Sequence, residues 1–164
     1  MSELDEITDF LRALDDAGAQ VIDTHISRVV IGGERAYKIK RPVLFPYLDF
    51  STREKRAAAA ANELALNRRT APELYLGLRR VTREACGGLA LDGAGEAIET
   101  VVEMRSFDQD DLFDALAQQG RLTSELMTKL TQRIAQFHAA AAPDFSCGGA
   151  EGVARVLRVD EPAL

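Results

Sequence analysis

Residues 27–40 have the sequence SRVVIGGERAYKIK, in which two runs rich in β-branched and aromatic residues flank a glycine pair. Such runs favour extended strands, and Gly32-Gly33 provides the backbone freedom that a tight turn needs. Val21 and Ile22 form a third run just upstream. Residues 19–40 are therefore predicted to form a three-strand antiparallel meander.

A helix is predicted to follow this meander. Ser51 and Glu54 have the spacing of a capping box, and the alanine run of residues 57–61 continues a helical pattern as far as Arg69, before Pro72. The prolines in residues 41–50 oppose regular structure there. The sequence thus predicts an irregular loop and then a helix over residues 51–69.

A second meander is predicted in residues 74–104. Its β-rich runs occupy residues 74–84, 89–91 and 97–104, and they are separated by Gly87-Gly88 and by the stretch DGAG of residues 92–95. Two meanders that flank one helix can close into a single antiparallel sheet with the helix on one face. The predicted fold class is therefore α+β.

Further helices are expected on both sides of this unit. Ser2 and Asp5 have capping-box spacing at the start of a predicted helix over residues 3–17. Asp108 or Asp110 is expected to cap a short helix that runs through Leu112 to Gln119. Thr123 is expected to cap a longer helix that ends near Ala141. Residues 145–164 are predicted to be mildly β-like and to complete no packed element, so the chain is expected to be truncated.

The composition excludes several classes of function. The 164 residues contain 20 Lys and Arg against 26 Asp and Glu, and a net charge of −6 disfavours nucleic-acid binding. No apolar run approaches the roughly 20 residues of a membrane span, and the acidic N-terminus lacks a signal peptide's basic region, so a cytoplasmic location without membrane contact is expected. Cys86 and Cys147 lie far apart without a CxxC motif, which argues against a metal site or a disulfide framework.

The order of the predicted elements is that of a protein-kinase small lobe, which carries a lysine on its third strand and an acidic partner on the next helix. The chain resembles the amino-terminal part of the aminoglycoside phosphotransferase-like kinases, and most of all the branch in which this domain precedes a P-loop ATPase domain. The resemblance covers roughly residues 19–141 and rests on residues 27–40, on residues 62–77 (NELALNRRTAPELYLG) and on residues 101–104 (VVEM). After the N-terminal helix already predicted in residues 1–18, it implies a kinase-like small lobe in 19–104, a hinge in 105–109 and the start of a truncated large lobe in 110–164.

The resemblance also implies roles for particular side chains. Lys38 would meet the phosphates of ATP, Glu63 would hold that lysine, and Ala36 would leave room for the adenine ring. Lys40 lies on the same face of the strand and would exchange roles with Lys38 if the register were shifted. Alternatively, both lysines are solvated residues of an edge strand.

Two further regions would approach the nucleotide. Glu103 and Met104, followed by Arg105, fall where the hinge would present its backbone to adenine. The turn at residues 23–27, DTHIS, lacks the glycines of a protein-kinase phosphate loop. Thr24, His25 and Ser27 are candidate phosphate contacts there, and an ordinary polar hairpin turn is the alternative.

Motifs that complete phosphoryl transfer are absent from this sequence. No His-x-Asp follows Ala141, and no GxxxxGK[ST] phosphate loop occurs. The resemblance therefore implies a nucleotide-binding portion of a phosphotransferase, with ATP as its ligand, magnesium bound only in the complete protein and no transfer by this chain alone. The alternative is a non-enzymatic helical protein-interaction module.

An apolar stripe on the predicted helix of residues 123–141 needs cover. Its members are Leu126, Leu130, Ile134 and Phe137. Four such side chains left in water would each forgo about 1.5 to 3 kcal/mol of burial. The stripe is predicted to pack on the short helix around residues 112–116, on a second copy in a homodimer, or on a missing C-terminal lobe.

Overall fold

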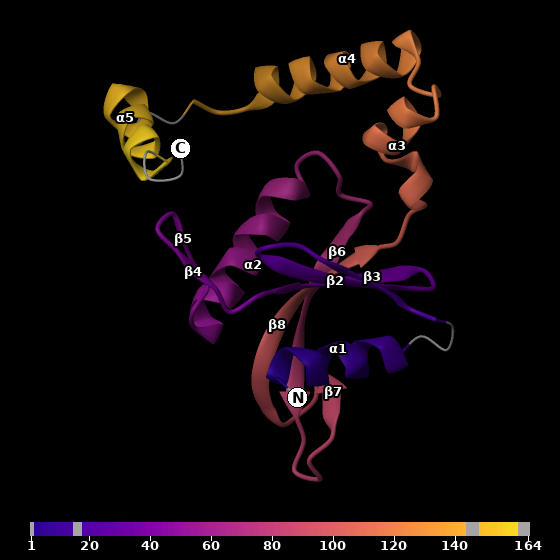
Figure 1. Ribbon diagram of the computed structural model, residues 1–164, viewed down its shortest axis with the longest axis vertical. Helices are drawn as coiled ribbons and strands as arrows, with labels where there is room; N and C mark the ends of the chain where they lie inside the picture. The colour runs from indigo at the N-terminus through magenta and orange to yellow at the C-terminus, as the bar shows by residue number, and fades with distance from the viewer. Residues whose placement is uncertain (1, 15–17, 144–147, 161–164) are drawn as a thin grey trace. The chain divides into compact units, whose positions relative to one another are not determined.

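The computed structural model describes residues 2–14, 18–143 and 148–160 (Figure 1). The chain divides into two compact units. The first comprises Met1–Leu44 and Asp49–Leu112, and the second comprises Phe45–Leu48 and Phe113–Leu164.

The first unit is built on one six-stranded antiparallel sheet, as predicted. Its strands lie in the order β1-β2-β3-β8-β6-β7. Strand β8 pairs with β3, for example Lys38 with Val102, and also with β6, so it joins the two meanders. The strands are β1 (Gln20–Asp23), β2 (Ser27–Gly32), β3 (Arg35–Lys40), β6 (Tyr75–Arg83), β7 (Leu89–Leu91) and β8 (Glu96–Arg105).

Helix α1 (Glu3–Ala13) packs on this sheet and supplies much of the core. Ile7 and Leu11 are buried together with Val30, Tyr37, Ile39 and other sheet residues. The predicted capping box is confirmed, because the Ser2 hydroxyl accepts from the Asp5 amide and the Asp5 carboxylate accepts from the Ser2 amide. The helix ends at Ala13, and the predicted extension over residues 15–17 lies outside the described residues.

Three ion pairs hold α1 against the rest of the unit. Arg28 binds Asp5 at 3.0 Å, Arg83 binds Glu6 at 2.7 Å, and Arg53 binds Glu3 at 2.6 Å. Hydrogen bonds from Ser2 and from Arg28 hold the pKa of Asp5 at about 2, below its ordinary value of 3.8.

The lowered pKa of Asp5 predicts an acid-sensitive attachment of α1. A carboxyl whose pKa falls on folding contributes its full stabilisation when the pH is above its pKa in the unfolded protein. This stabilisation is lost as the pH falls from about 4 to about 2. We expect Asp5→Asn to lower the melting temperature at pH 7 and to flatten its fall between pH 4 and pH 2, as followed by circular dichroism. Asp9→Asn on the same helix is the control, and parallel pH profiles for Asp5→Asn and the unaltered chain would contradict the prediction.

Helix α2 (Arg53–Asn67) packs against β8 and β6, which confirms the predicted helix between the meanders. Its N-cap is Thr52, whose hydroxyl accepts from the Lys55 amide, and not Ser51 as the capping-box spacing predicted. The Ser51 hydroxyl instead donates to the Asp49 carboxylate at 2.6 Å. A nearby acceptor therefore removed Ser51 from the capping position.

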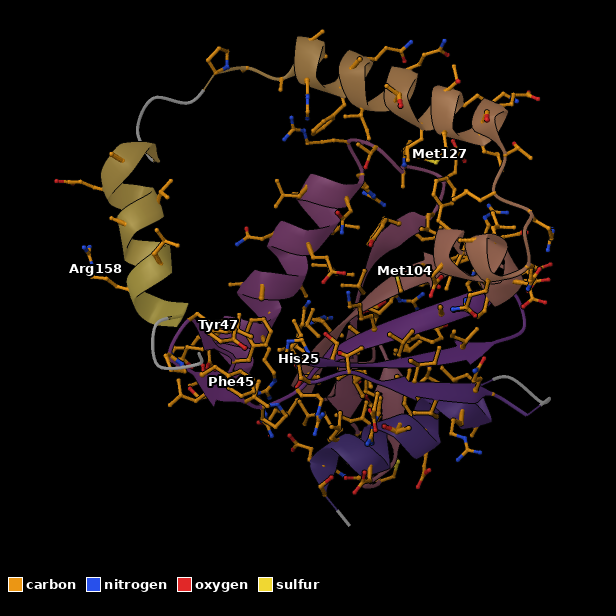
Figure 2. The ribbon with its side chains drawn as sticks, turned by 45° about the horizontal axis from the view of Figure 1, so that its top comes forward. His25, Phe45, Tyr47, Met104, Met127 and Arg158 are labelled. Carbon is orange, nitrogen blue, oxygen red and sulfur yellow. The ribbon has the colours of Figure 1, made fainter. Side chains whose placement is uncertain are left out.

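The loop predicted as irregular contains a small hairpin. Strand β4 (Leu44–Phe45) pairs with β5 (Leu48–Asp49). The Phe45 and Tyr47 rings stack with their centroids 5.6 Å apart (Figure 2). Stacking of these two aromatic side chains stabilises a turn that Pro46 alone would not specify.

The second unit is mostly helical. It contains α3 (Phe113–Gln118), α4 (Ser124–Ala140) with the predicted Thr123 cap, and α5 (Gly149–Asp160). The prediction of β-like structure over residues 145–164 is wrong for the part that α5 occupies. Val153 and Leu157 are four residues apart, which is helical spacing, and the β-branched content of the segment obscured this period.

The apolar stripe of α4 is not buried. None of the described residues of α4 reaches full burial, Leu126, Leu130 and Phe137 are half-buried, and Ile134 is 45% exposed. The stripe is therefore only partly covered in the described part of the chain. None of the helices in the described part of the chain combines the length and apolarity needed to cross a bilayer.

Candidate functional site

The predicted lysine and glutamate meet between β3 and α2. The Lys38 Nζ lies 2.8 Å from the Glu63 Oε1, which confirms that these two side chains face one another. Lys38 shares one face of β3 with Ala36, whereas the alternating residues Tyr37 and Ile39 belong to the core that packs on α1. The face that carries Lys38 is thus opposite the face that α1 covers.

Lys40 contacts the same carboxylate. Its ammonium binds the Glu63 Oε2, and its side chain is only 7% exposed, compared with 28% for Lys38. The Lys40 Nζ also lies 5.6 Å from the centroid of the Phe50 ring. The alternative of two solvated edge-strand lysines is therefore wrong, because β3 is an inner strand and both ammonium groups are bound to Glu63.

Electrostatics keep Glu63 ionised. Burial by itself would raise the pKa of Glu63, but the hydrogen bonds from Lys38 and Lys40 outweigh burial and lower it below the ordinary value. The carboxylate therefore remains a charged acceptor for both ammonium groups at neutral pH.

A pocket of about 320 Å³, the small pocket, opens beside Lys38. Its walls are mostly apolar, with the Lys38 cation among them, and its volume lies at the lower end of the range typical of ligand sites. Ala36 is one of its lining residues. Its other described residues are Ile22, Val29, Ile31, Leu74, Tyr75, Met104, Arg105, Ser106, Phe107 and Gln109.

Tyr75 is a pocket residue that the sequence did not single out. Its hydroxyl accepts a hydrogen bond from the Asn67 side chain at 3.0 Å, and burial, followed by the charge of Glu63, raises its pKa. Arg68 donates to the Tyr75 carbonyl at 2.7 Å and so ties the end of α2 to the start of β6. The alternation of residues in β6 does not say which of them lies at the pocket. Tyr75 could have been recognised as a pocket residue only from the register of β6 beside β8, in which it pairs with Met104.

The predicted hinge residues divide between the two faces of β8. Met104 lines the small pocket, and its side chain is labelled in Figure 2. The Glu103 side chain instead pairs with Arg35 at 3.5 Å and with Arg79 at 3.3 Å. Neighbouring residues of a strand point to opposite faces, so Glu103 could contribute only its backbone to this pocket.

The connector predicted at residues 105–109 is shorter in the structure. Arg105 still belongs to β8, and its amide donates to the Leu74 carbonyl. Gln109 begins a short 3-10 helix, η1 (Gln109–Asp111). Residues 106–108 therefore form the segment between regular elements.

Thr24 and Ser27 shape the turn between β1 and β2. The Thr24 hydroxyl donates to the Ser27 carbonyl at 2.9 Å and accepts from the Ser27 amide at 3.0 Å. Ser27 is buried, and neither residue lines the small pocket. The described geometry thus agrees with the alternative of an ordinary polar hairpin turn, in which His25 is exposed.

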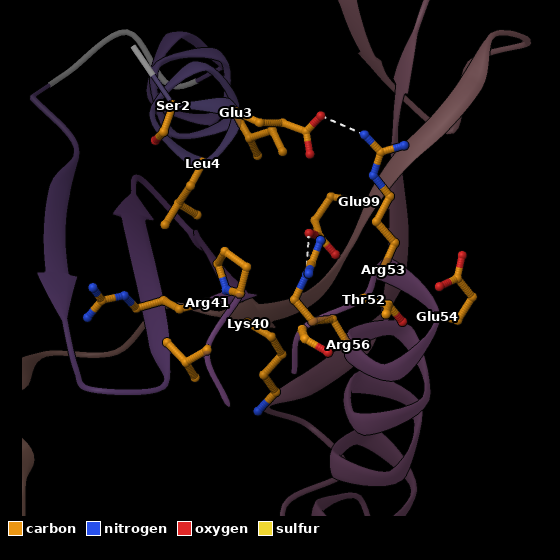
Figure 3. Close-up of a pocket in the computed structure, with 14 residues that line it drawn as sticks. Ser2, Glu3, Leu4, Lys40, Arg41, Thr52, Arg53, Glu54, Arg56 and Glu99 are labelled. Carbon is orange, nitrogen blue, oxygen red and sulfur yellow. Dashed lines mark hydrogen bonds and ion pairs between the residues drawn. The ribbon is translucent and has the colours of Figure 1, made fainter. Parts of the chain in front are cut away.

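A second cavity, the large pocket of about 560 Å³, lies beside the N-terminal turns of α1 and α2 (Figure 3). At its wall Arg56 donates to the Glu99 carboxylate at 2.8 Å, and Arg53 binds Glu3. Lys40 also lines this cavity. The two lysines of β3 therefore border different pockets while they share Glu63.

Metal-ligating side chains do not gather in the described part of the chain. No group of three or more His, Cys, Asp or Glu residues that could hold a metal ion occurs there. Cys86 is exposed and free, and Cys147 lies outside the described residues.

The chain is similar to longer mycobacterial proteins. It is 31% identical over 124 residues to the uncharacterized protein Rv2004c of Mycobacterium tuberculosis and to the uncharacterized protein Mb2027c of Mycobacterium bovis. The match covers 76% of this chain and 23% of each relative, so the chain spans less than a quarter of the length of these curated relatives. No family model matches the chain, and no solved structure matches it.

Proposed function

We propose that the chain is the nucleotide-binding N-terminal portion of a kinase-like phosphotransferase, similar to the aminoglycoside phosphotransferase-like kinases. The observation that carries the proposal is the Lys38–Glu63 ion pair at 2.8 Å beside an apolar pocket. Phosphoryl transfer requires a positioned cation at the phosphates, and a carboxylate on a packed helix holds a flexible lysine in one geometry. ATP is the proposed ligand.

The small pocket supports this proposal by its chemistry. The half-buried side chains of Ile22, Val29 and Ile31 form an apolar wall suited to a flat base, and Ala36 adds little bulk to it. Lys38 provides positive charge within reach of an attached phosphate chain. An apolar pocket with few, placed polar groups is typical of small-molecule sites.

The complete protein would supply the remaining chemistry. Phosphoryl transfer also needs an aspartate that orients the acceptor hydroxyl and ligands for magnesium, and the expected motifs do not follow α4 in this sequence. We therefore place magnesium binding and transfer to a small-molecule hydroxyl in the complete protein, and we expect this chain alone to bind nucleotide without transferring phosphate. We also propose that a further part of the complete protein packs on the apolar stripe of α4.

Replacing Lys38 by methionine tests the proposed function. We expect the substitution to weaken ATP binding about tenfold or more, because a charge-assisted hydrogen bond to a phosphate contributes roughly 1.5 to 3 kcal/mol. Isothermal titration calorimetry with ATP measures the change. The matched control is Lys129→Met, since Lys129 is exposed on α4 and does not line the small pocket. Equal ATP affinity of the Lys38→Met and Lys129→Met variants would contradict the assignment of Lys38.

A non-enzymatic interaction module is the second candidate. The observation that favours it is the apolar surface of the second unit, where Met127 and Ile134 of α4 and Val153 and Leu157 of α5 are exposed. Such a surface is typical of a helix that packs on another chain, including a second copy of this one. Under this reading the chain would show no saturable ATP binding, and light scattering would report a mass that rises with concentration.

A further inference from the structure

Glu63 is held by two lysines instead of one. The Lys38 ammonium binds Oε1, and the Lys40 ammonium binds Oε2. Two ammonium groups and one carboxylate leave the cluster with one net positive charge. A single lysine paired with the same carboxylate would leave it neutral.

The two lysines are not equivalent. Lys40 is the more buried, contacts the Phe50 ring and lies on the wall of the large pocket. Lys38 is more exposed and lines the small pocket. An ammonium group carries three N–H donors, so Lys38 can bind Glu63 and still donate to a ligand. A ligand in the small pocket would therefore meet the positive charge of the cluster at the Lys38 ammonium.

We propose that Lys40 is a positioning residue that neutralises Glu63, so that Lys38 presents uncompensated positive charge to the small pocket and the pocket selects a ligand with a polyanionic end. This inference rests on the proposed function, because it concerns the phosphate end of the same nucleotide. It assigns the preference for a triphosphate over an uncharged nucleoside to a residue outside the small pocket. Tyr75, whose pKa responds to both Glu63 and Lys38, is a further titratable group beside the cluster.

The charge of the cluster can be changed in defined steps. Lys40→Met leaves one lysine and one carboxylate, which is a neutral pair. Adding Glu63→Gln removes the negative charge and returns one net positive charge at Lys38, while the amide oxygen of the substituted side chain can still accept from the Lys38 ammonium and hold it in place. Lys40→Arg keeps the charge of the unaltered protein. If Lys40 served folding alone, the double variant would bind ATP more weakly than Lys40→Met, because it removes more native interactions than the single variant.

The experiment compares the binding of magnesium-free ATP and of adenosine by isothermal titration calorimetry at fixed ionic strength. We expect Lys40→Met to weaken ATP binding about five- to tenfold and to leave adenosine binding unchanged, because only the phosphates sense the lost charge. The Lys40→Met/Glu63→Gln double variant should recover most of the ATP affinity, and Lys40→Arg should bind like the unaltered chain. Circular dichroism melts verify that each variant is folded.

Several outcomes would overturn the inference. These are unchanged ATP affinity of Lys40→Met, an equal loss of adenosine affinity, or a double variant that binds ATP more weakly than Lys40→Met. Should Lys40→Met not fold, Lys40→Gln takes its place, because it also removes the charge but keeps a polar end that can donate to Glu63. Unchanged ATP affinity of that variant would overturn the inference. All of these leave ATP binding by the unaltered chain intact, whereas a complete lack of ATP binding by that chain contradicts the proposed function as well.

Discussion

Replacing Arg56 by methionine is expected to lower the free energy of unfolding by about 3 to 5 kcal/mol, the cost typical of breaking a buried ion pair. The Arg56 and Glu99 side chains are 6% and 5% exposed, and their contact at 2.8 Å joins α2 to β8. Arg56 also donates to the Phe50 carbonyl, and Glu99 accepts from the Thr100 amide. Without Arg56 the buried carboxylate would lose its counter-charge.

Urea unfolding measures this loss, and Arg53→Met provides a matched control. Arg53 lies on the same helix, but its side chain is 40% exposed in its pair with Glu3, so its replacement should cost less than about 1 kcal/mol. Similar losses for the two variants would show that burial does not set the strength of the Arg56 pair. Removing both partners with Arg56→Met/Glu99→Leu should recover part of the stability.

The pH dependence provides a second check on Arg56. Burial already raises the pKa of Glu99, although Thr100 and Arg56 oppose this, and loss of Arg56 should raise it further. An acid whose pKa rises on folding destabilises the protein increasingly as the pH rises from its unfolded pKa to its higher folded pKa. The loss caused by Arg56→Met should therefore be larger at pH 7 than at pH 5, and equal losses would contradict the prediction.

The second large effect is expected for Gly95→Ala in the turn between β7 and β8. A Cβ at this position would lie 2.0 Å from the Arg83 carbonyl oxygen, which belongs to the backbone of β6 and cannot rotate away. We expect a loss of about 3 kcal/mol in the free energy of unfolding, at the upper end of the usual cost of overpacking. The Gly95 amide also donates to the Glu84 carboxylate at 3.2 Å, and movement of the turn would weaken that bond.

Gly88→Ala is the matched control for Gly95→Ala. It lies between β6 and β7, and a Cβ there would meet only the Cys86 Sγ, at 3.9 Å. Its unfolding midpoint in urea should stay close to that of the unaltered chain. An unchanged midpoint for Gly95→Ala as well would contradict the close approach of the Gly95 Cα to the Arg83 carbonyl.

Local chemistry explains what could be predicted. The β-rich runs around Gly32-Gly33, the alanine-rich helix and the Thr123 cap depend on neighbours within a few residues, and the structure contains all three. Where two local signals compete, the prediction was wrong. Ser51 and Thr52 are both good N-caps, and the Asp49 carboxylate decides between them by binding Ser51.

The candidate site could be predicted only in part. The alternation of strand residues placed Ala36, Lys38 and Lys40 on one face, and the family resemblance singled out Glu63. The joint binding of both lysines by Glu63, the position of Tyr75 and the turning of Glu103 toward Arg35 and Arg79 were not foreseen. Each depends on how one element is rotated or aligned beside another that is distant in sequence.

The sequence by itself determined the α+β order of elements and the side of β3 that bears charge, because turn residues, helix caps and strand alternation act over short distances. Only the tertiary structure decided that Lys40 is buried against Phe50, that Arg56 finds Glu99, and that Lys38 faces the small pocket. The Arg56–Glu99 contact, for example, joins α2 to a strand residue 43 positions away, through the packing of whole elements. Burial decides how much free energy is lost when one partner of an ion pair is removed. The burial of a side chain depends on how whole elements pack, and local sequence patterns do not encode that packing.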